Sequence, residues 1–134
     1  MPSNFTKPLI VKKISARLWE VQGGFSYAVG SEDSKEVIHI PHGFLTDFAS
    51  VPRPFWIIFP PDGQYTQSSV LHDFLYHSRL YTRKRSDRIF LEAMKVLKVS
   101  WWRRRTIYRA VRMFGWLAWK SKIKRVERHL KMPE

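Results

Sequence analysis

Residues 67–97 read QSSVLHDFLYHSRLYTRKRSDRIFLEAMKVL, and this stretch decides the fold because two helical patterns follow one another within it. The apolar residues of the first pattern share one helical stripe: Val70, Leu71, Phe74 and Leu75. Those of the second pattern do the same: Ile89, Phe90, Ala93, Met94 and Leu97. We predict one helix over Gln67–Arg79 and another that begins near Thr82 or Ser86, packed antiparallel because their connection is tight.

Downstream, the sequence predicts a third and longer helix, which Ser100 caps and which reaches roughly to Leu130. The residues expected to face the core recur at helical spacing: Ile107, Val111, Phe114 and Ala118. Gly115 lies inside this helix, where a glycine costs about 1 kcal/mol of stability relative to alanine.

Upstream, residues 1–40 predict β-structure. Short runs rich in β-branched and aromatic residues are typical of strands: Leu9–Val11, Ala16–Val21, Phe25–Val29 and Glu36–Ile40. Gly23-Gly24 lies between two of these runs and indicates a hairpin turn, so we expect a small antiparallel meander. Residues 41–65 contain five prolines and several aromatic residues, which predicts a long ordered loop. With helices over residues 66–131, the expected fold is α+β in a single domain, residues 1–134.

The composition excludes several classes of protein. With 44% hydrophobic and 15% aromatic residues, the chain can fill a core and is not a disordered tail. It has no cysteine, which excludes a disulfide scaffold, a thiolate nucleophile and a cysteine-ligated metal. The sequence has no run of about 18 uncharged apolar residues and does not begin with a signal-peptide pattern. We therefore expect a soluble product of the cytoplasm.

The basic charge is concentrated in one part of the chain. Residues 1–78 hold six basic and seven acidic side chains, whereas residues 79–134 hold eighteen basic and four acidic ones. A basic face attracts polyanions such as anionic lipid headgroups or nucleic acid. The candidate polyanion-binding residues begin the third helix: Trp101, Trp102, Arg103, Arg104, Arg105 and Arg109. The alternative is a helix that packs its tryptophans on the sheet and leaves its arginines solvated.

A histidine and two aspartates in the helical pair could carry chemistry. His72 and Tyr76 are four residues apart and share a helix face, while Asp73 points to a neighbouring face. Asp87 is the acidic residue in the first turn of the second helix, and antiparallel packing brings it towards His72. It would then fix the imidazole tautomer so that the other nitrogen can accept a proton from water. The alternative is that His72 is a core histidine bonded to a backbone carbonyl, and that Tyr76 is a core aromatic.

The sequence His72-Asp73-Phe74-Leu75-Tyr76, followed by Ser86-Asp87-Arg88, resembles the active site of phospholipase A2 enzymes. The resemblance implies that His72 is the general base, that Asp87 orients it and that Tyr76 supplies a supporting hydroxyl. It also implies a calcium ion at Asp73, and calcium is the one cofactor that we expect. The glycine-rich calcium loop of those enzymes has no counterpart before His72, so Asp47 and Asp62 are the remaining candidate ligands. Asp47 also fits a turn cap before Pro52.

A second resemblance covers Ile40 to about Trp119. The stretch that carries it runs Ile40-Pro41-x-Gly43-Phe44-x-Thr46-Asp47-Phe48-Ala49-Ser50-Val51-Pro52-Arg53, and it is similar to the hallmark of domain of unknown function 1353. That family occurs in phages and prophages, which implies a phage protein made in the host cytoplasm.

Three functions follow from these observations. The leading hypothesis is a phage-encoded, phospholipase A2-like hydrolase that docks on an anionic membrane and cleaves a lipid ester. The first alternative is a non-enzymatic virion or tail accessory protein, whose partners are other virion proteins. The second alternative is a basic nucleic-acid-binding module. The hydrolase needs the chemistry of His72, Asp73 and Asp87, whereas the nucleic-acid binder needs the basic face alone.

Overall fold

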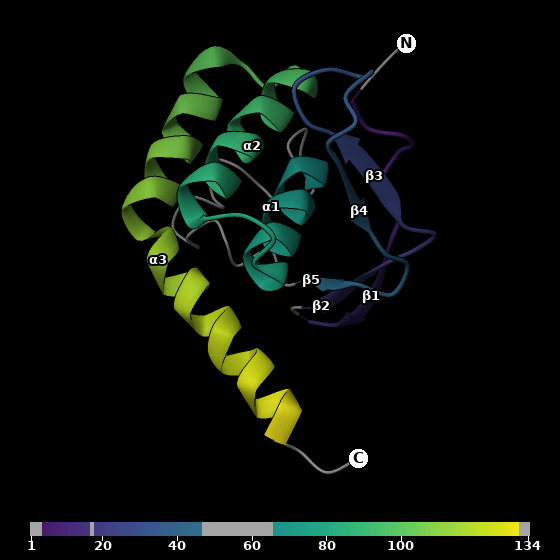
Figure 1. Cartoon of the computed structure of the whole chain (residues 1–134), viewed down its shortest axis with the longest axis vertical. Helices are drawn as coiled ribbons and strands as arrows, with labels where there is room; N and C mark the ends of the chain where they lie inside the picture. Colours follow the sequence, from purple (N-terminus) through teal and green to yellow (C-terminus); the bar gives the residue numbers. More distant parts are fainter. Residues whose placement is uncertain (1–3, 17, 47–65, 132–134) are drawn as a thin grey trace.

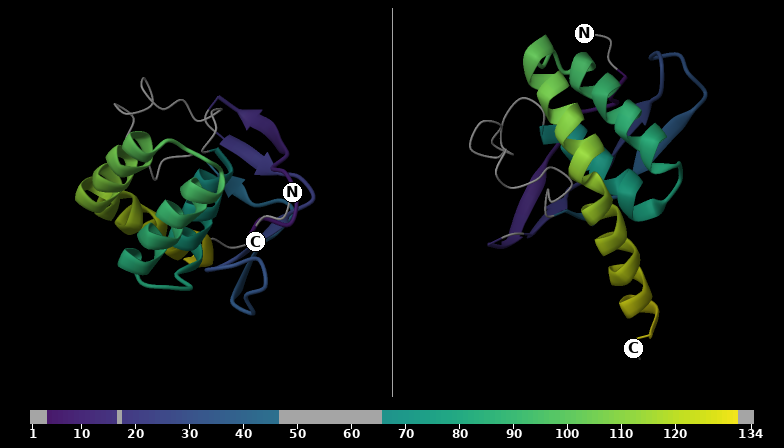
Figure 2. Two further views of the ribbon diagram at one scale, coloured as in Figure 1. Left: turned by 90° about the horizontal axis from the view of Figure 1, so that it is seen from above. Right: turned by 90° about the vertical axis from the view of Figure 1, so that its left-hand side faces the viewer.

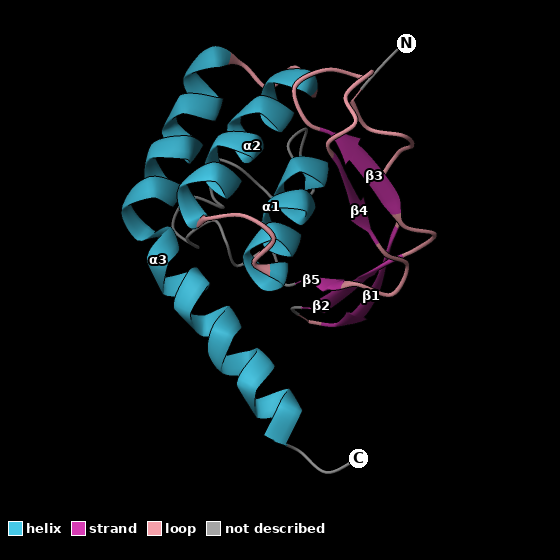
Figure 3. Ribbon diagram, in the orientation of Figure 1, coloured by secondary structure: helices cyan, strands magenta, loops and turns pink. Residues whose placement is uncertain are grey.

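In the computed structural model of the chain, strands occupy the N-terminal part and helices the remainder (Figures 1 and 3). The structure describes residues 4–16, 18–46 and 66–131, with side chains as far as Lys120. The strands are β1 (Val11–Ser15), β2 (Leu18–Val21), β3 (Phe25–Ala28), β4 (Val37–Ile40) and β5 (Leu45–Thr46). The helices are α1 (Thr66–Ser78), α2 (Arg83–Val96) and α3 (Trp101–Lys131). The predicted α+β fold, with antiparallel strands and then three helices in the described part of the chain, is confirmed.

The described strands form two antiparallel sheets, one in the order β1-β2-β5 and the other made of β3 and β4. The hairpin predicted at Gly23-Gly24 is therefore wrong, because β2 and β3 belong to different sheets. Gly24 has a φ of +66°, and a Cβ atom on it would lie 2.7 Å from the carbonyl oxygen of Ile40. Glycine lets the chain pass close to the end of β4 as it leaves one sheet for the other.

Helix α1 lies between the sheets and the other two helices, and it contacts α2, α3 and β5 (Figures 1 and 2). Helix α2 begins next to Thr82, one of the two predicted starts, and Thr82 caps it, because its side-chain oxygen accepts a hydrogen bond from the backbone N–H of Arg85 at 3.2 Å. The main core includes buried side chains of α1 and of the sheets: Val70, Leu71, Leu75, Tyr27, Ile38 and Ile40. A second cluster joins α2 and its C-terminal end to α3: Phe90, Met94, Val99, Ile107 and Val111.

The buried face of α3 differs from the prediction at one position. Ile107 and Val111 are fully buried and Ala118 is half-buried, but Phe114 is 43% exposed. The buried stripe continues through Gly115, one residue later, because a period of 3.6 residues allows a step of either three or four from Val111. No helix within the described residues has the length and apolarity needed to cross a bilayer.

Candidate active site

His72, Tyr76 and Asp87 meet between α1 and α2, and all three side chains are fully buried. The Nε2 atom of His72 lies 2.7 Å from Oδ1 of Asp87, so the hydrogen bond predicted from the sequence is present. The hydroxyl of Tyr76 donates to the same oxygen at 2.5 Å. The ring of His72 stacks on Phe90 of α2 with centroids 4.5 Å apart. Local helical spacing on α1 and α2 therefore brings the histidine, the tyrosine and the carboxylate together.

Two arginines hold the second oxygen of Asp87. Nη1 of Arg112, from α3, donates to Oδ2 at 2.6 Å, and Nη1 of Arg83 lies 3.5 Å from the same atom. Arg83 also donates to the backbone carbonyl of Val111 at 3.2 Å. Neither arginine was predicted from the sequence. The i,i+4 spacing of Arg83 and Asp87 is a signal that could have found the first, whereas Arg112 depends on how α3 packs.

These contacts keep Asp87 ionised. Burial by itself raises the pKa of the Asp87 carboxyl, but the hydrogen bonds from His72, Tyr76 and Arg112 outweigh it, so the pKa lies below its ordinary value. Burial raises the pKa of the Tyr76 hydroxyl, and the negative charge of Asp87 raises it further. At neutral pH Tyr76 is therefore a donor and Asp87 an acceptor.

An ionised Asp87 accepts a hydrogen bond from the Nε2–H of a neutral His72, so the lone pair of this imidazole is on Nδ1. Within the described part of the chain, the buried Nδ1 atom has no hydrogen-bond partner. A histidine held in one tautomer by a carboxylate, with its second nitrogen unused, can accept a proton from a water molecule, but here Nδ1 is buried, so that water has to enter the core.

Asp73 points away from this network towards the sheet. Its Oδ2 atom accepts a hydrogen bond from the hydroxyl of Thr46, at the end of β5, at 2.7 Å. Calcium takes six to eight oxygen ligands, and the described residues contain no cluster of three acidic or histidine side chains that could hold a metal. Asp47 and Asp62 lie outside the described residues, as does most of the predicted loop at residues 41–65. A calcium site at Asp73 therefore stays a prediction.

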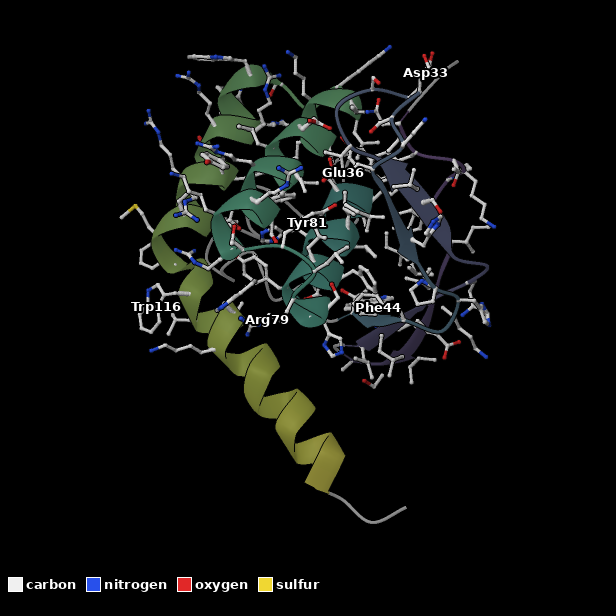
Figure 4. The ribbon with its side chains drawn as sticks, in the orientation of Figure 1. Asp33, Glu36, Phe44, Arg79, Tyr81 and Trp116 are labelled. Atoms are coloured by element: carbon white, nitrogen blue, oxygen red, sulfur yellow. The ribbon has the colours of Figure 1, made fainter. Side chains whose placement is uncertain are left out.

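Helix α3 packs against the ring of Tyr76. Trp119 meets the Tyr76 ring edge-on with centroids 5.1 Å apart, and the guanidinium of Arg79 lies 3.5 Å from the centroid of Trp119. Arg79, labelled in Figure 4, also donates a hydrogen bond to the carbonyl of Trp119. Trp119 thus packs against Tyr76 and joins α3 to α1 beside the His72–Asp87 pair.

The candidate polyanion-binding residues lie on the outside of α3. Five of them are exposed: Trp101, Trp102, Arg103, Arg105 and Arg109. Arg104 is half-buried and donates a hydrogen bond to the carbonyl of Val99 at 3.2 Å. The structure therefore separates Arg104 from the other basic residues of the predicted set.

Comparison with known proteins places the chain in a family. The family described as "Protein of unknown function (DUF1353)" matches residues 19–111, a range that includes α1, α2 and the part of α3 up to Val111. The chain belongs to this family. Its description confirms the family predicted from the sequence and names no activity.

An uncharacterised protein of Sinorhizobium fredii (strain NBRC 101917 / NGR234), y4jT, is 33% identical over 78 residues. The match covers 57% of this chain and 23% of the relative, so the chain spans about a quarter of that protein. No solved structure matches the chain.

Proposed function

We propose that this member of the family is a phage-encoded hydrolase that cleaves a carboxylic ester of a phospholipid, with His72 as its general base. One observation carries the proposal: Nε2 of His72 is bound to the buried carboxylate of Asp87, while Nδ1 has no hydrogen-bond partner among the described residues. The resemblance of the His72–Tyr76 segment to phospholipase A2 enzymes supplies the substrate class. The family resemblance implies a phage protein, so the proposed substrate is a phospholipid of the host membrane.

The proposed reaction needs one proton to move twice. Nδ1 of His72 takes a proton from a water molecule while the water oxygen bonds to the ester carbonyl carbon. The tetrahedral intermediate then breaks the bond between that carbon and the alcohol oxygen, and the proton on Nδ1 passes to the leaving alkoxide. The products are a carboxylic acid and an alcohol, and the imidazole is neutral again.

Asp87 contributes by position and charge. Its carboxylate stabilises the imidazolium that exists between the two proton transfers, and this attraction is stronger in a buried site than in water. Tyr76 and Arg112 hold the carboxylate from opposite oxygens, and Phe90 fixes the plane of the His72 ring. Tyr76 is thus a positioning residue, which acts through Asp87.

A second candidate is a non-enzymatic virion accessory protein. The observation that favours it is the complete burial of His72 and Asp87, together with the way Asp87 joins residues of all three described helices. In that case the network stabilises the fold and has no reaction to perform.

The test compares two histidine variants on α1. His72→Gln removes the base, whereas His77→Gln makes the same change at a half-buried histidine five residues later on α1. The hydrogen-bond partners of Asp87 are His72, Tyr76, Arg83 and Arg112, so His77 is outside this network. The assay is release of fatty acid from a short-chain phosphatidylcholine dispersed as monomers, with and without added calcium. General base catalysis contributes about 10²–10⁴-fold, so His72→Gln should lose at least a hundredfold in rate while His77→Gln retains it.

Thermal unfolding shows whether the His72→Gln protein is folded, since glutamine can still donate to Asp87. A folded His72→Gln protein with the wild-type rate would contradict the proposal. An absence of turnover by the wild-type protein in both calcium conditions would favour the virion protein.

A further inference from the structure

We infer that the outward face of α3 docks the protein on the surface of an anionic phospholipid bilayer. We define this docking face by six exposed residues at successive steps of three or four: Trp102, Arg105, Arg109, Met113, Trp116 and Lys120. The stripe is about 27 Å long, because each residue of a helix rises about 1.5 Å. It lies opposite the buried stripe through Ile107, Val111 and Gly115.

The apolar members of the docking face are open to solvent. Trp102 is 53% exposed, Met113 is 65% exposed and Trp116 is 44% exposed. Figure 4 shows Trp116 on the outer side of α3, pointing away from the body of the molecule. Leu117, beside this stripe, is also exposed. Side chains of this size gathered on one face of a single helix indicate a surface that another apolar phase covers.

Basic side chains of α3 lie next to its exposed tryptophan rings. Lys120 Nζ is 5.0 Å from the ring centroid of Trp116, and the guanidinium of Arg105 is 5.2 Å from that of Trp101. At a lipid–water interface, indoles sit at the depth of the headgroups while cations meet the phosphates. The pairing of the two residue types along α3 fits both layers of that interface.

The charge of the docking face helps to decide which partner binds there. From Trp101 to Lys120 inclusive, the sequence has six basic residues and no acidic one, so a second copy of the chain would bring like charges together. Nucleic acid would suit the arginines and the tryptophans. Its surface is lined by charged phosphates, however, and presents much less apolar area to the side chains of Met113 and Leu117 than the interior of a bilayer does. An anionic bilayer is therefore the partner that fits both the charge and the apolar area.

This inference rests on the proposed function for what the protein does at the membrane, but binding itself needs no catalysis. Vesicle binding is therefore measured for both the His72→Gln variant and the wild type. That variant keeps the docking face and loses the proposed base, so a failure of hydrolysis leaves the binding result intact.

The binding experiment uses flotation of the full chain with vesicles of phosphatidylglycerol and phosphatidylcholine at about 0.15 M salt. The charge variant combines Arg105→Gln, Arg109→Gln and Lys120→Gln. A control variant removes three exposed lysines from other elements: Lys12→Gln, Lys35→Gln and Lys95→Gln. Each charge near the surface is worth about 1 kcal/mol, so the charge variant should bind roughly a hundredfold more weakly, and the control much less so. Both variants should unfold at the wild-type temperature, because exposed substitutions change stability little.

The depth experiment uses vesicles of the same headgroups with brominated acyl chains, which quench indole fluorescence only at close range. Trp102→Phe combined with Trp116→Phe should remove most of the quenching, whereas Trp19→Phe, on β2, should leave it. Three results would overturn the inference: no binding of the wild type to anionic vesicles, equal losses in the charge and control variants, or tight binding to duplex DNA without quenching by the vesicles. The last result would assign the face to nucleic acid.

Discussion

The Cβ position of Gly115 lies 2.6 Å from the hydroxyl oxygen of Tyr76, closer than a real Cβ atom ever comes to such a neighbour. The same position lies 3.2 Å from Nη1 of Arg83. Glycine therefore sets how near α3 comes to α1. That approach lets Arg112, three residues earlier on α3, reach the carboxylate of Asp87.

Gly115→Ala should destabilise the protein even though alanine is the better helix former. The gain in helix propensity is about 1 kcal/mol, while overpacking costs about 1–3 kcal/mol and disturbs the Tyr76–Asp87 hydrogen bond. We expect a net loss of about 1 kcal/mol in the free energy of unfolding, measured with urea. In a Tyr76→Phe background the hydroxyl is absent, so the same substitution should cost less. A Gly115→Ala protein more stable than the wild type would mean that α3 does not approach α1 in this way.

Arg112→Gln tests the ion pair with Asp87. The variant loses a hydrogen bond to a charged group, which is worth about 2 kcal/mol of unfolding free energy at neutral pH. The folded pKa of Asp87 lies below its unfolded value of about 3.9, so the stability that ionised Asp87 contributes is present above that value. It is lost as the pH falls through the folded pKa, where Asp87 becomes neutral. The difference between wild type and variant should therefore shrink in acid.

Urea unfolding at pH 7 and at a series of pH values that falls from about 4 measures that difference. Arg109→Gln is the matched control, because Arg109 is an exposed arginine of α3 without an ion pair among the described residues. Its effect should be small at every pH value. An Arg112→Gln effect that stayed the same size in acid would contradict the ion pair.

Glu92→Ala should weaken the link between α2 and the sheet of β3 and β4. Oε1 of Glu92 accepts a hydrogen bond from the Tyr27 hydroxyl at 2.6 Å and another from the backbone N–H of Gly30 at 2.8 Å. Removing the carboxylate leaves a buried hydroxyl without its partner, which costs about 1–3 kcal/mol of unfolding free energy. Tyr27→Phe removes that hydroxyl, so the double variant should lose less than the two single losses combined. Strict additivity in urea unfolding would argue against this link.

The features of this fold that could be predicted from the sequence are those that depend on local information. Helical periodicity defined the three helices, and the positions of His72 and Asp87 on adjacent helices were enough to predict that they meet. A step of three or four residues from Val111 is equally helical, so the choice between Phe114 and Gly115 depended on packing that periodicity does not encode. The contact of Arg112 with Asp87 depends on the same packing. Gly23-Gly24 indicated a turn, but a turn signal does not say which strands will pair across it.

Tyr76→Phe should lower the turnover number of the proposed hydrolysis without changing KM for a dispersed substrate. The Tyr76 hydroxyl contacts Asp87 and not the reacting atoms. Its loss removes one hydrogen bond that positions the carboxylate, and this carboxylate orients His72. A change of about 1.4 kcal/mol in the barrier corresponds to about tenfold in kcat, less than we expect for His72→Gln. Tyr27→Phe is the matched control, because it also removes a buried hydroxyl bonded to a carboxylate, that of Glu92. If both tyrosine variants lowered kcat equally, general destabilisation would explain the loss, and Tyr76 would have no positioning role.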